Sequence, residues 1–253
     1  MKFIRDRVLR RELMFGVGAQ LGSSLTVEMI GAAGFDWTWI DCEHGAGGYS
    51  ELITQIQVAA LGNAPPVVRI AWNEAPRFKR VLDLGASGIM VPYVNNKTEA
   101  RLAAQSMRYQ PEGIRGVAQS PRSCGFGQNF DEYYARANDN LLTVVQIETR
   151  EAVDNAAEIA AVPGVDVLFV GPFDLSINME IIKNFDHPEF VTALQTVSDA
   201  CKQHGKAAGI LTPRSDYLTA WIEMGYTFFV VGSDSGCVTN GLNQIYGACK
   251  KFK

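Results

Sequence analysis

Two patterns of apolar residues alternate along the chain. Short, nearly unbroken runs rich in Val and Ile are each followed by a segment in which apolar residues recur every three or four positions. The runs are typical of strands buried on both faces, and the periodic segments are typical of amphipathic helices. The strands are predicted at 14–21, 35–45, 65–72, 86–94, 141–149, 166–173, 206–212 and 227–233.

A helical segment follows each of these eight strands. Strand-then-helix units joined by short links predict a (β/α)8 TIM barrel of the α/β class, and an open doubly wound sheet is the alternative. No linker or low-complexity stretch divides the sequence, so we expect residues 1–253 to form a single barrel domain. The helices are predicted at 23–34, 49–62, 75–85, 97–107, 131–139, 150–164, 188–205, 216–225 and 241–252.

The composition narrows the class of protein. Hydrophobic residues make up 47% of the chain and charged residues 20%, which is enough apolar material for a sizeable core. The net charge of −4 gives no indication of nucleic acid or an anionic membrane as a partner. The expected partners are therefore small molecules.

Location is also constrained by the sequence. No apolar run reaches the roughly 18 residues that a membrane span requires, and the charged residues 1–13 lack the hydrophobic region of a signal peptide. The cysteines are odd in number and lack CxxC spacing, which indicates reduced thiols rather than disulfides or a zinc site. A cytoplasmic protein is predicted from these five residues, Cys42, Cys124, Cys201, Cys237 and Cys249.

Acidic residues occur near the carboxyl ends of two apolar runs. In the run 141–149, Gln146 and Glu148 are two residues apart, so their side chains point to the same face of the strand. Asp174 comes just after the next run. A carboxylate that faces a core is costly unless it is paired or holds a metal. Glu148 and Asp174 could therefore hold one divalent cation.

Further ionisable residues follow the neighbouring strands. Asp41 and His44 end the second strand, Arg69 lies in the third, and Asp83 lies near the end of the helix that follows it. A single His or Arg is usually structural, but several ionisable groups at successive units favour a site. Because chemistry in a barrel collects at the carboxyl ends of the strands, we expect these groups to share one site with the two acidic residues.

The expected chemistry follows from the residue types. Two carboxylates without a cysteine pair suit Mg²⁺, Mn²⁺ or Co²⁺. Such an ion could chelate a 2-oxo acid, polarise its carbonyl and acidify the adjacent methyl group. Arg69 could then stabilise the developing enolate oxygen. His44 titrates in the right range to move the proton, and a neighbouring aspartate would raise its basicity.

A Schiff-base aldolase is the competing mechanism, and it needs a lysine inside the barrel. No predicted strand core contains one. Lys206 stands at the start of its strand, and Lys97 and Lys183 lie in polar connections. The sequence therefore favours metal chemistry over an imine.

Several motifs, in their order along the chain, resemble those of the HpcH/HpaI aldolase family. The members are metal-dependent (class II) pyruvate aldolases and include 4-hydroxy-2-oxoheptane-1,7-dioate aldolase. The resemblance covers nearly the whole chain and rests on WIDCEHG, VVRIAWN, KRVLDLGASGIMVP, YQPEGIRG, VVQIET and VGPFDLS. It implies a carbon–carbon lyase that forms or cleaves 4-hydroxy-2-oxo acids through a pyruvate enolate, with oxaloacetate decarboxylation as a side activity.

The resemblance also implies catalytic roles. The family's base falls on His44, and the aspartate that enhances it falls on Asp83. The arginine that stabilises the transition state falls on Arg69. Asp41 is implied as a partner of water on the metal.

Roles in binding are implied in the same way. The metal ligands fall on Glu148 and Asp174, and Gln146 would lie beside the substrate. The backbone amides of Phe173 and Asp174 would hold the carboxylate of pyruvate. The resemblance thus implies that these residues bind one half of the substrate.

Two positions depart from the family's usual residues. Phe173 stands where many members have a small residue, and Gly18 stands where an aromatic residue is common near the entrance. Two alternatives follow. One is an enzyme like macrophomate synthase, which decarboxylates oxaloacetate and traps the enolate differently. The other is a non-catalytic barrel that binds a metal and an oxo acid.

The aldehyde half of the substrate is expected to contact loops. These are the turn at 211–212, residues contributed by a neighbouring subunit, and the segment 109–130, which contains four glycines, two prolines and no clear period. A loop of this length in a compact domain is usually functional or disordered. The bulk of Phe173 should favour small or flat aldehydes, and a dicarboxylic product would need Arg115 or Arg122.

Assembly is the last expectation. Members of the family generally form hexamers, so the resemblance implies a homo-oligomer. The final predicted helix has an apolar side with Leu242, Ile245 and Tyr246. That side could pack on a neighbouring copy, or simply on the chain's own barrel.

Overall fold

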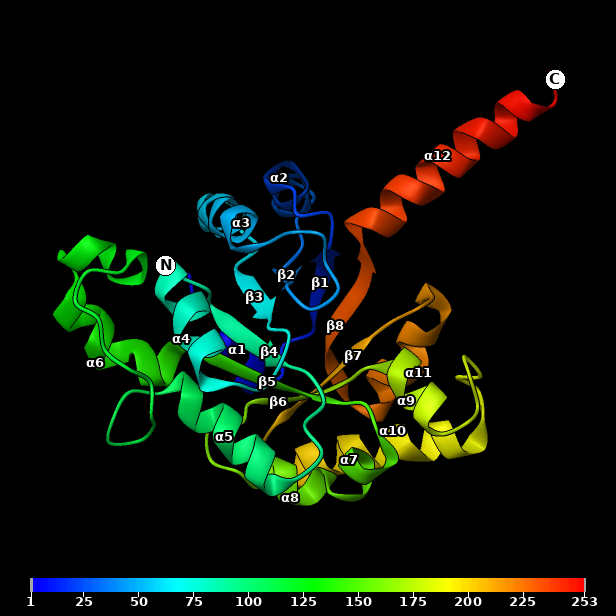
Figure 1. Cartoon of the computed structure of the whole chain (residues 1–253). Helices are drawn as coiled ribbons and strands as arrows, with labels where there is room; N and C mark the ends of the chain where they lie inside the picture. The colour runs from blue at the N-terminus through cyan, green and yellow to red at the C-terminus, as the bar shows by residue number, and fades with distance from the viewer. Residues whose placement is uncertain (1, 253) are drawn as a thin grey trace.

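A computed structural model describes residues 2–252 and contains a closed barrel of eight parallel strands (Figure 1). The strands follow one another around the barrel in chain order, and β8 pairs with β1 to close it. The predicted (β/α)8 fold is therefore confirmed. The strands are β1 (Met14–Ala19), β2 (Trp37–Asp41), β3 (Pro66–Arg69), β4 (Gly88–Val91), β5 (Leu142–Ile147), β6 (Val167–Val170), β7 (Ala207–Leu211) and β8 (Tyr226–Ser233).

Helices occur between all successive strands. The predicted helix 150–164 is divided in two, and the short α1 and α9 were not predicted because so few residues show no periodicity. The helices are α1 (Arg5–Leu9), α2 (Ser24–Ala32), α3 (Tyr49–Leu61), α4 (Ala75–Leu84), α5 (Lys97–Met107), α6 (Phe130–Asn140), α7 (Arg150–Asp154), α8 (Ala156–Ala160), α9 (Pro172–Asn178), α10 (Pro188–Gln203), α11 (Leu218–Met224) and α12 (Asp234–Lys250), with 3-10 turns η1 (Arg122–Gly127) and η2 (Ser215–Tyr217).

The inside of the barrel is filled by large side chains. Trp37 stacks on Phe228 with ring centroids 4.1 Å apart. A Cβ atom at Gly16 would lie 2.4 Å from the Trp37 ring, so only glycine leaves room for it. Ile4 and Val8 of the N-terminal region join this inner cluster and close the amino-terminal end of the barrel. The inner space is thus a packed core that leaves only the other end free for a site.

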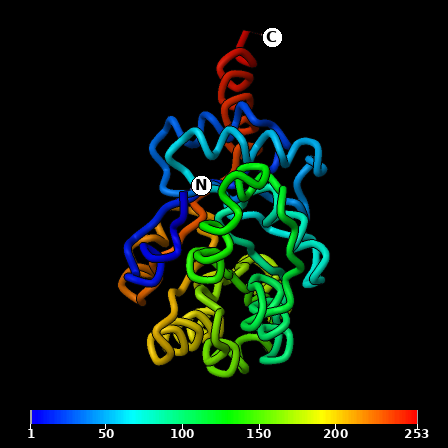
Figure 2. The backbone as a smooth tube through the Cα atoms, turned by 90° about the vertical axis from the view of Figure 1, so that its left-hand side faces the viewer, coloured from blue at the N-terminus to red at the C-terminus, as the bar shows by residue number. Residues whose placement is uncertain are grey.

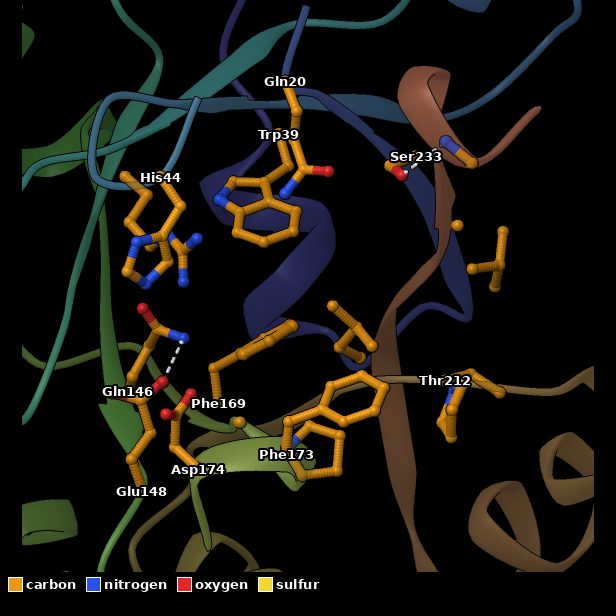
Figure 3. A pocket seen from close by; sticks show the side chains of 18 of the residues that line it. Gln20, Trp39, His44, Gln146, Glu148, Phe169, Phe173, Asp174, Thr212 and Ser233 are labelled. Carbon is orange, nitrogen blue, oxygen red and sulfur yellow. Dashed lines mark hydrogen bonds between the residues drawn. The ribbon is translucent and has the colours of Figure 1, made fainter. Parts of the chain in front are cut away.

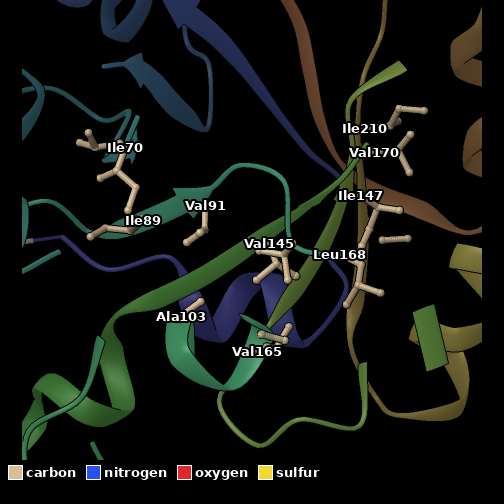
Figure 4. Packing of buried hydrophobic residues seen from close by; sticks show 14 of the residues in the cluster. Ile70, Ile89, Val91, Ala103, Val145, Ile147, Val165, Leu168, Val170 and Ile210 are labelled. Carbon is tan, nitrogen blue, oxygen red and sulfur yellow. The ribbon is translucent and has the colours of Figure 1, made fainter. Parts of the chain in front are cut away.

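A second core lies between the strands and the surrounding helices. Side chains on the outer faces of the strands, such as Ile89, Val145 and Leu168, are fully buried there (Figure 4). Strands with apolar residues on both faces explain the unbroken apolar runs in the sequence. No helix within residues 2–252 is long and apolar enough to cross a membrane.

Helix α12 differs from the other helices because it leaves the barrel. Figures 1 and 2 show it projecting away from the other elements toward the C-terminus. Its main contacts are with β1 and β8 near its first turn, and Asp234 is its one buried residue. Ser233 caps the helix by accepting a hydrogen bond from the Gly236 amide at 3.2 Å.

The long segment 109–130 is not at the mouth of the barrel. It joins the end of α5 to α6 and β5, so it lies near the amino-terminal ends of the strands. There η1 packs against α4 and α6. Arg122 donates a hydrogen bond to the Leu84 carbonyl at the end of α4, at 2.8 Å. The expectation that this segment contacts the aldehyde is therefore wrong for the chain's own pocket.

Candidate active site

A cavity of about 580 Å³ opens at the carboxyl ends of the strands (Figure 3). In (β/α)8 enzymes this is the end that carries the chemistry. The residues that line it fall into two groups. One group is charged or strongly polar and comprises His44, Arg69, Gln146, Glu148 and Asp174. The other is apolar or uncharged and includes Gln20, Phe169, Phe173, Leu211, Thr212, Pro213, Val231, Ser233, Cys237 and Asn240.

Arg69, at the end of β3, is the centre of a buried ion network. Its Nε and Nη2 atoms donate to the two carboxylate oxygens of Asp41 at 2.9 and 2.6 Å. Its Nη1 lies 3.0 Å from Glu43 Oε2, and its guanidinium packs over Trp39, 4.4 Å from the ring centroid. Two acidic partners and an aromatic ring thus fix the arginine in one orientation.

The pKa values of the two carboxylates in this network are shifted in opposite directions. Burial raises the pKa of Asp41, but the hydrogen bonds and charge of Arg69 outweigh it and hold this pKa below its ordinary value. Burial also raises the pKa of Glu43, and there the charge of Arg69 only partly offsets it. Asp41 is thus the firmly ionised partner of the arginine.

Glu148, just past the end of β5, is buried and held from two sides. Its Oε1 accepts a hydrogen bond from Gln146 Nε2 at 2.9 Å, and its Oε2 accepts one from the Tyr93 amide at 3.0 Å. A Cβ atom at Gly171 would lie 2.4 Å from Glu148 Oε1, so the glycine makes room for the carboxylate. The backbone therefore gives this side chain a fixed position at the mouth.

Asp174, in the first turn of α9, lies on the same side of the cavity. The Tyr93 hydroxyl donates to its Oδ1 at 3.3 Å, so Tyr93 contacts both acidic residues. Burial, and then the charge of Asp174, raise the pKa of Glu148 to about 8. Burial and the same two carboxylates raise the pKa of Tyr93 to about 12. Two acidic groups are thus held close together where their charges repel.

The residues here fit a hard divalent cation. A cation between Glu148 and Asp174 would offset the burial and repulsion that raise the pKa of Glu148. The buried Oε1 of Gln146 has no protein hydrogen-bond partner and could turn toward the same ion or its water. Among residues 2–252 no three His, Cys, Asp or Glu gather as a complete ligand set. The remaining ligands would therefore be water and substrate oxygens, which Mg²⁺ and Mn²⁺ accept.

His44 lies at the rim, in the loop after β2. Its side chain is 68% exposed, and its Nε2 atom is 3.9 Å from Glu43 Oε2. Its backbone amide donates to Asp41 Oδ1 at 3.2 Å, which ties the loop to the arginine network. An exposed imidazole beside a carboxylate can exchange protons with both a substrate and solvent.

Asp83 is not brought to this site within one chain. It lies at the end of α4, five residues before β4 begins at Gly88, and so at the opposite end of the barrel. There Arg115 Nη2 donates to its Oδ1 at 2.9 Å. The expectation that Asp83 shares a mouth with His44 is thus wrong for a single chain. Its role as the enhancing residue remains a prediction that would require a second copy.

Two residues of the site, Glu43 and Tyr93, were not identified from the sequence. Glu43 contacts both Arg69 and His44, and Tyr93 contacts both proposed metal ligands. Each follows the carboxyl end of a strand, and that position was the available signal. Neither residue type was distinctive enough to single out without the contacts.

Comparison with known proteins agrees with this geometry. The family model described as HpcH/HpaI aldolase/citrate lyase matches residues 13–241. The 5-keto-4-deoxy-D-glucarate aldolase of Escherichia coli (strain K12) is 39% identical over 241 residues, which are 95% of this chain and 94% of that protein. Aldolases of the same name therefore resemble this chain along almost their full length.

Solved structures agree as well. An HpcH/HpaI aldolase/citrate lyase family protein from Burkholderia cenocepacia J2315 is 33% identical, covers 98% of both chains and has a TM-score of 0.92. Macrophomate synthase is 28% identical, with 99% of this chain and 91% of that one covered and a TM-score of 0.82. The chain is a lyase of the HpcH/HpaI aldolase/citrate lyase family.

Proposed function

We propose that this enzyme is a metal-dependent aldolase that forms or cleaves 4-hydroxy-2-oxo acids through a pyruvate enolate. The observation that carries this proposal is that two neighbouring carboxylates, Glu148 and Asp174, line the same cavity as a fixed arginine and an exposed histidine. The named relative is an aldolase for 5-keto-4-deoxy-D-glucarate, which supports the same class of reaction.

Pyruvate would bind on the charged side of the cavity. Glu148 and Asp174 would hold the ion, with Mg²⁺, Mn²⁺ and Co²⁺ as candidates, and Gln146 would lie beside the substrate. When bound, the ion would polarise the pyruvate carbonyl. The first amides of α9, at Phe173 and Asp174, have no carbonyl within the helix to bond and would donate hydrogen bonds to the substrate carboxylate.

The chain's own groups would then move the proton and stabilise charge. His44 would remove a proton from the methyl carbon of pyruvate, and the electron pair would pass to the carbonyl oxygen as the enolate. Two of the five N–H groups of Arg69 donate to Asp41, and its Nη1 atom pairs with Glu43. The N–H groups that Asp41 does not bond could donate to the enolate oxygen. The enolate carbon would attack the aldehyde, and the new alkoxide would take up a proton.

Oxaloacetate provides the direct test, because loss of CO₂ from it gives the same enolate without an aldehyde. The metal-loaded enzyme should decarboxylate oxaloacetate and should exchange the methyl hydrogens of pyruvate with deuterium. Measuring both reactions with EDTA tests whether a metal is needed, and measuring them with metal but no enzyme gives the rate of free-metal catalysis. If neither reaction exceeds the rate of metal alone, the proposed function is wrong. Binding of metal and pyruvate without turnover would instead support a non-catalytic barrel.

A decarboxylase like macrophomate synthase is the second candidate. Two observations support this candidate: the structural likeness to macrophomate synthase, and the phenyl ring of Phe173 at the cavity. The two functions differ in what traps the enolate. An aldolase consumes aldehyde and pyruvate together, whereas the second candidate turns over oxaloacetate but leaves simple aldehydes unreacted.

We also propose that the enzyme assembles, as a hexamer if it follows its family. The side chains of Leu242 and Ile245 on α12 are 62% and 65% exposed, and the helix projects from its own barrel. A neighbouring copy is the simplest cover for this apolar side. Assembly would also be the way to bring an Asp83 to His44. We keep the cytoplasm as the proposed location because of the five cysteines.

A further inference from the structure

Among the described residues of this chain, the acceptor side of the cavity offers no cation to meet a second carboxylate. We propose that the aldehyde acceptor is short and uncharged and carries a hydroxyl group that Thr212 binds. The products would then be 4-hydroxy-2-oxo acids with one carboxylate. This inference rests on the proposed function, since it concerns the partner of the pyruvate enolate.

The cavity lining carries little positive charge. Among the described residues that line it, Arg69 is the only Lys or Arg. That guanidinium already has two carboxylate partners, Asp41 and Glu43, and lies on the pyruvate side. The opposite side is formed by uncharged residues such as Phe173, Leu211 and Val231. A carboxylate placed there would lose hydration without gaining a counter-charge.

The two arginines that were expected to serve a dicarboxylic product, Arg115 and Arg122, lie elsewhere in the chain. Arg115 is buried, hydrogen-bonded to Asp83 and to the Tyr133 hydroxyl, and stacked on Tyr109. Arg122 is bonded to the end of α4. Both lie near the amino-terminal ends of the strands, so neither can reach this cavity in its own chain. A neighbouring copy that brought Asp83 to His44 would bring Arg115 as well, but already paired with that carboxylate.

Two other cations lie closer but outside the lining. Lys183 Nζ is 6.0 Å from the ring centroid of Phe173, and Arg214 pairs with Asp216 and stacks on Tyr217. The ring of Phe173 lies in the cavity wall and packs edge-on against Phe185. Arg214 follows the lining residue Pro213, and its partner Asp216 is exposed. Lys183 and Arg214 are therefore the two cations, among the residues described nearby, that could contradict the proposal.

Thr212 provides a hydrogen-bonding group on the acceptor side. Thr212 lines the cavity and is 4% exposed, and its Oγ1 has no hydrogen-bond partner within the protein (Figure 3). A buried hydroxyl left unpaired costs free energy, so a substrate hydroxyl that bonds it is favoured. With Leu211 and Phe173 nearby, the site suits a short hydroxyaldehyde.

Matched acceptors test the proposal. Glyceraldehyde carries a neutral hydroxymethyl group where tartronate semialdehyde carries a carboxylate. Lactaldehyde carries one hydroxyl group that propionaldehyde lacks. With metal and pyruvate, kcat/KM should be at least about tenfold higher for glyceraldehyde than for tartronate semialdehyde. In Thr212→Val the preference for lactaldehyde over propionaldehyde should shrink by about three- to tenfold, and Thr212→Ser should retain it.

Lys183→Met is the matched control and should leave the preference for the neutral acceptor unchanged. The proposal is overturned if the carboxylated acceptor is equal or better in the wild-type enzyme, and a loss of that activity in Lys183→Met would then identify the cation. An equal loss for both acceptors in Thr212→Val would remove Thr212 from recognition. Oxaloacetate decarboxylation without any aldehyde reaction would reject this inference alone, whereas failure of decarboxylation would reject the proposed function with it.

Discussion

The two sides of the cavity are built in different ways. On the pyruvate side, Arg69, Glu148 and Asp174 come from β3, β5 and α9 and are each held by hydrogen bonds to protein groups. On the acceptor side, residues of β7, β8 and α12 present apolar or uncharged groups. A fixed charged half suits one constant reaction, while a neutral half selects among aldehydes by shape and hydroxyl groups. Changes on the two sides should therefore affect different properties of the enzyme.

The largest effect is expected from the acidic pair. Glu148→Ala or Asp174→Ala should abolish metal binding and reduce oxaloacetate decarboxylation to background, because one carboxylate cannot hold the ion alone. Titration calorimetry with Mn²⁺ and decarboxylation at moderate metal excess measure this. The exposed carboxylate of Glu158 supplies the control Glu158→Ala. Retained metal affinity in the Glu148 variant would place the ion elsewhere.

His44 should be next in importance. His44→Ala should slow deuterium exchange into pyruvate by roughly 10²–10⁴, the range for general acid–base catalysis. Metal affinity should change little, because no described contact joins His44 to Glu148 or Asp174. His204→Ala, at the end of α10, is the matched control. Normal exchange in the His44 variant would mean that another group moves the proton.

Arg69 should show both a catalytic and a structural effect. Arg69→Ala should lower kcat by about 10²–10³, by analogy with groups that stabilise oxyanions, and should destabilise the fold by about 3–5 kcal/mol because it leaves Asp41 buried without its partner. Arg69→Lys keeps the charge but loses the paired hydrogen bonds, so it should recover stability more than activity. Thermal unfolding and kcat together separate the two effects, with the half-exposed Arg77→Lys as control. Unchanged turnover in Arg69→Ala would remove the arginine from the mechanism.

Phe173 tests the other side of the comparison. Phe173→Ala should widen the range of aldehydes accepted and change the acceptor profile more than the rate of oxaloacetate decarboxylation. The reason is that its ring forms the cavity wall, whereas the proposed carboxylate contact is its backbone amide. A panel of straight and branched aldehydes with pyruvate measures this, and Phe126→Ala on η1 is a remote aromatic control. Coinciding profiles for the two variants would show that the ring does not limit the acceptor.

Assembly would act on the charged side only through the Asp83 of a neighbouring copy, so its loss should have a smaller effect than loss of the residues above. The double variant Leu242→Glu, Ile245→Glu should dissociate the oligomer, because charges would replace the apolar side of α12. Light scattering should then give a mass near 27.7 kDa, against a multiple of it for the wild type. Asn243→Glu changes a polar position on the same helix and should remain assembled. A monomeric wild-type enzyme would contradict the proposal.

The sequence by itself determined the barrel and most of the charged half. Strands buried on both faces require unbroken apolar runs, and those runs predicted all eight strands in order. Parallel strands place their carboxyl ends together, so Arg69, Glu148 and Asp174 could be assigned to one mouth before any contact was known. These inferences succeed because they depend on local periodicity and on a regular topology.

Other features were decided only by the tertiary structure. Asp83 and the segment 109–130 belong to the far end of the barrel, because helices return the chain to the start of the next strand. The links from Tyr93 to Glu148 and Asp174 depend on how three separate units meet when the barrel closes. The amphipathic pattern of α12 is the same whether it covers its own barrel or a neighbour. A periodic pattern tells which side of a helix is apolar, but only the packing of the whole chain decides what covers it.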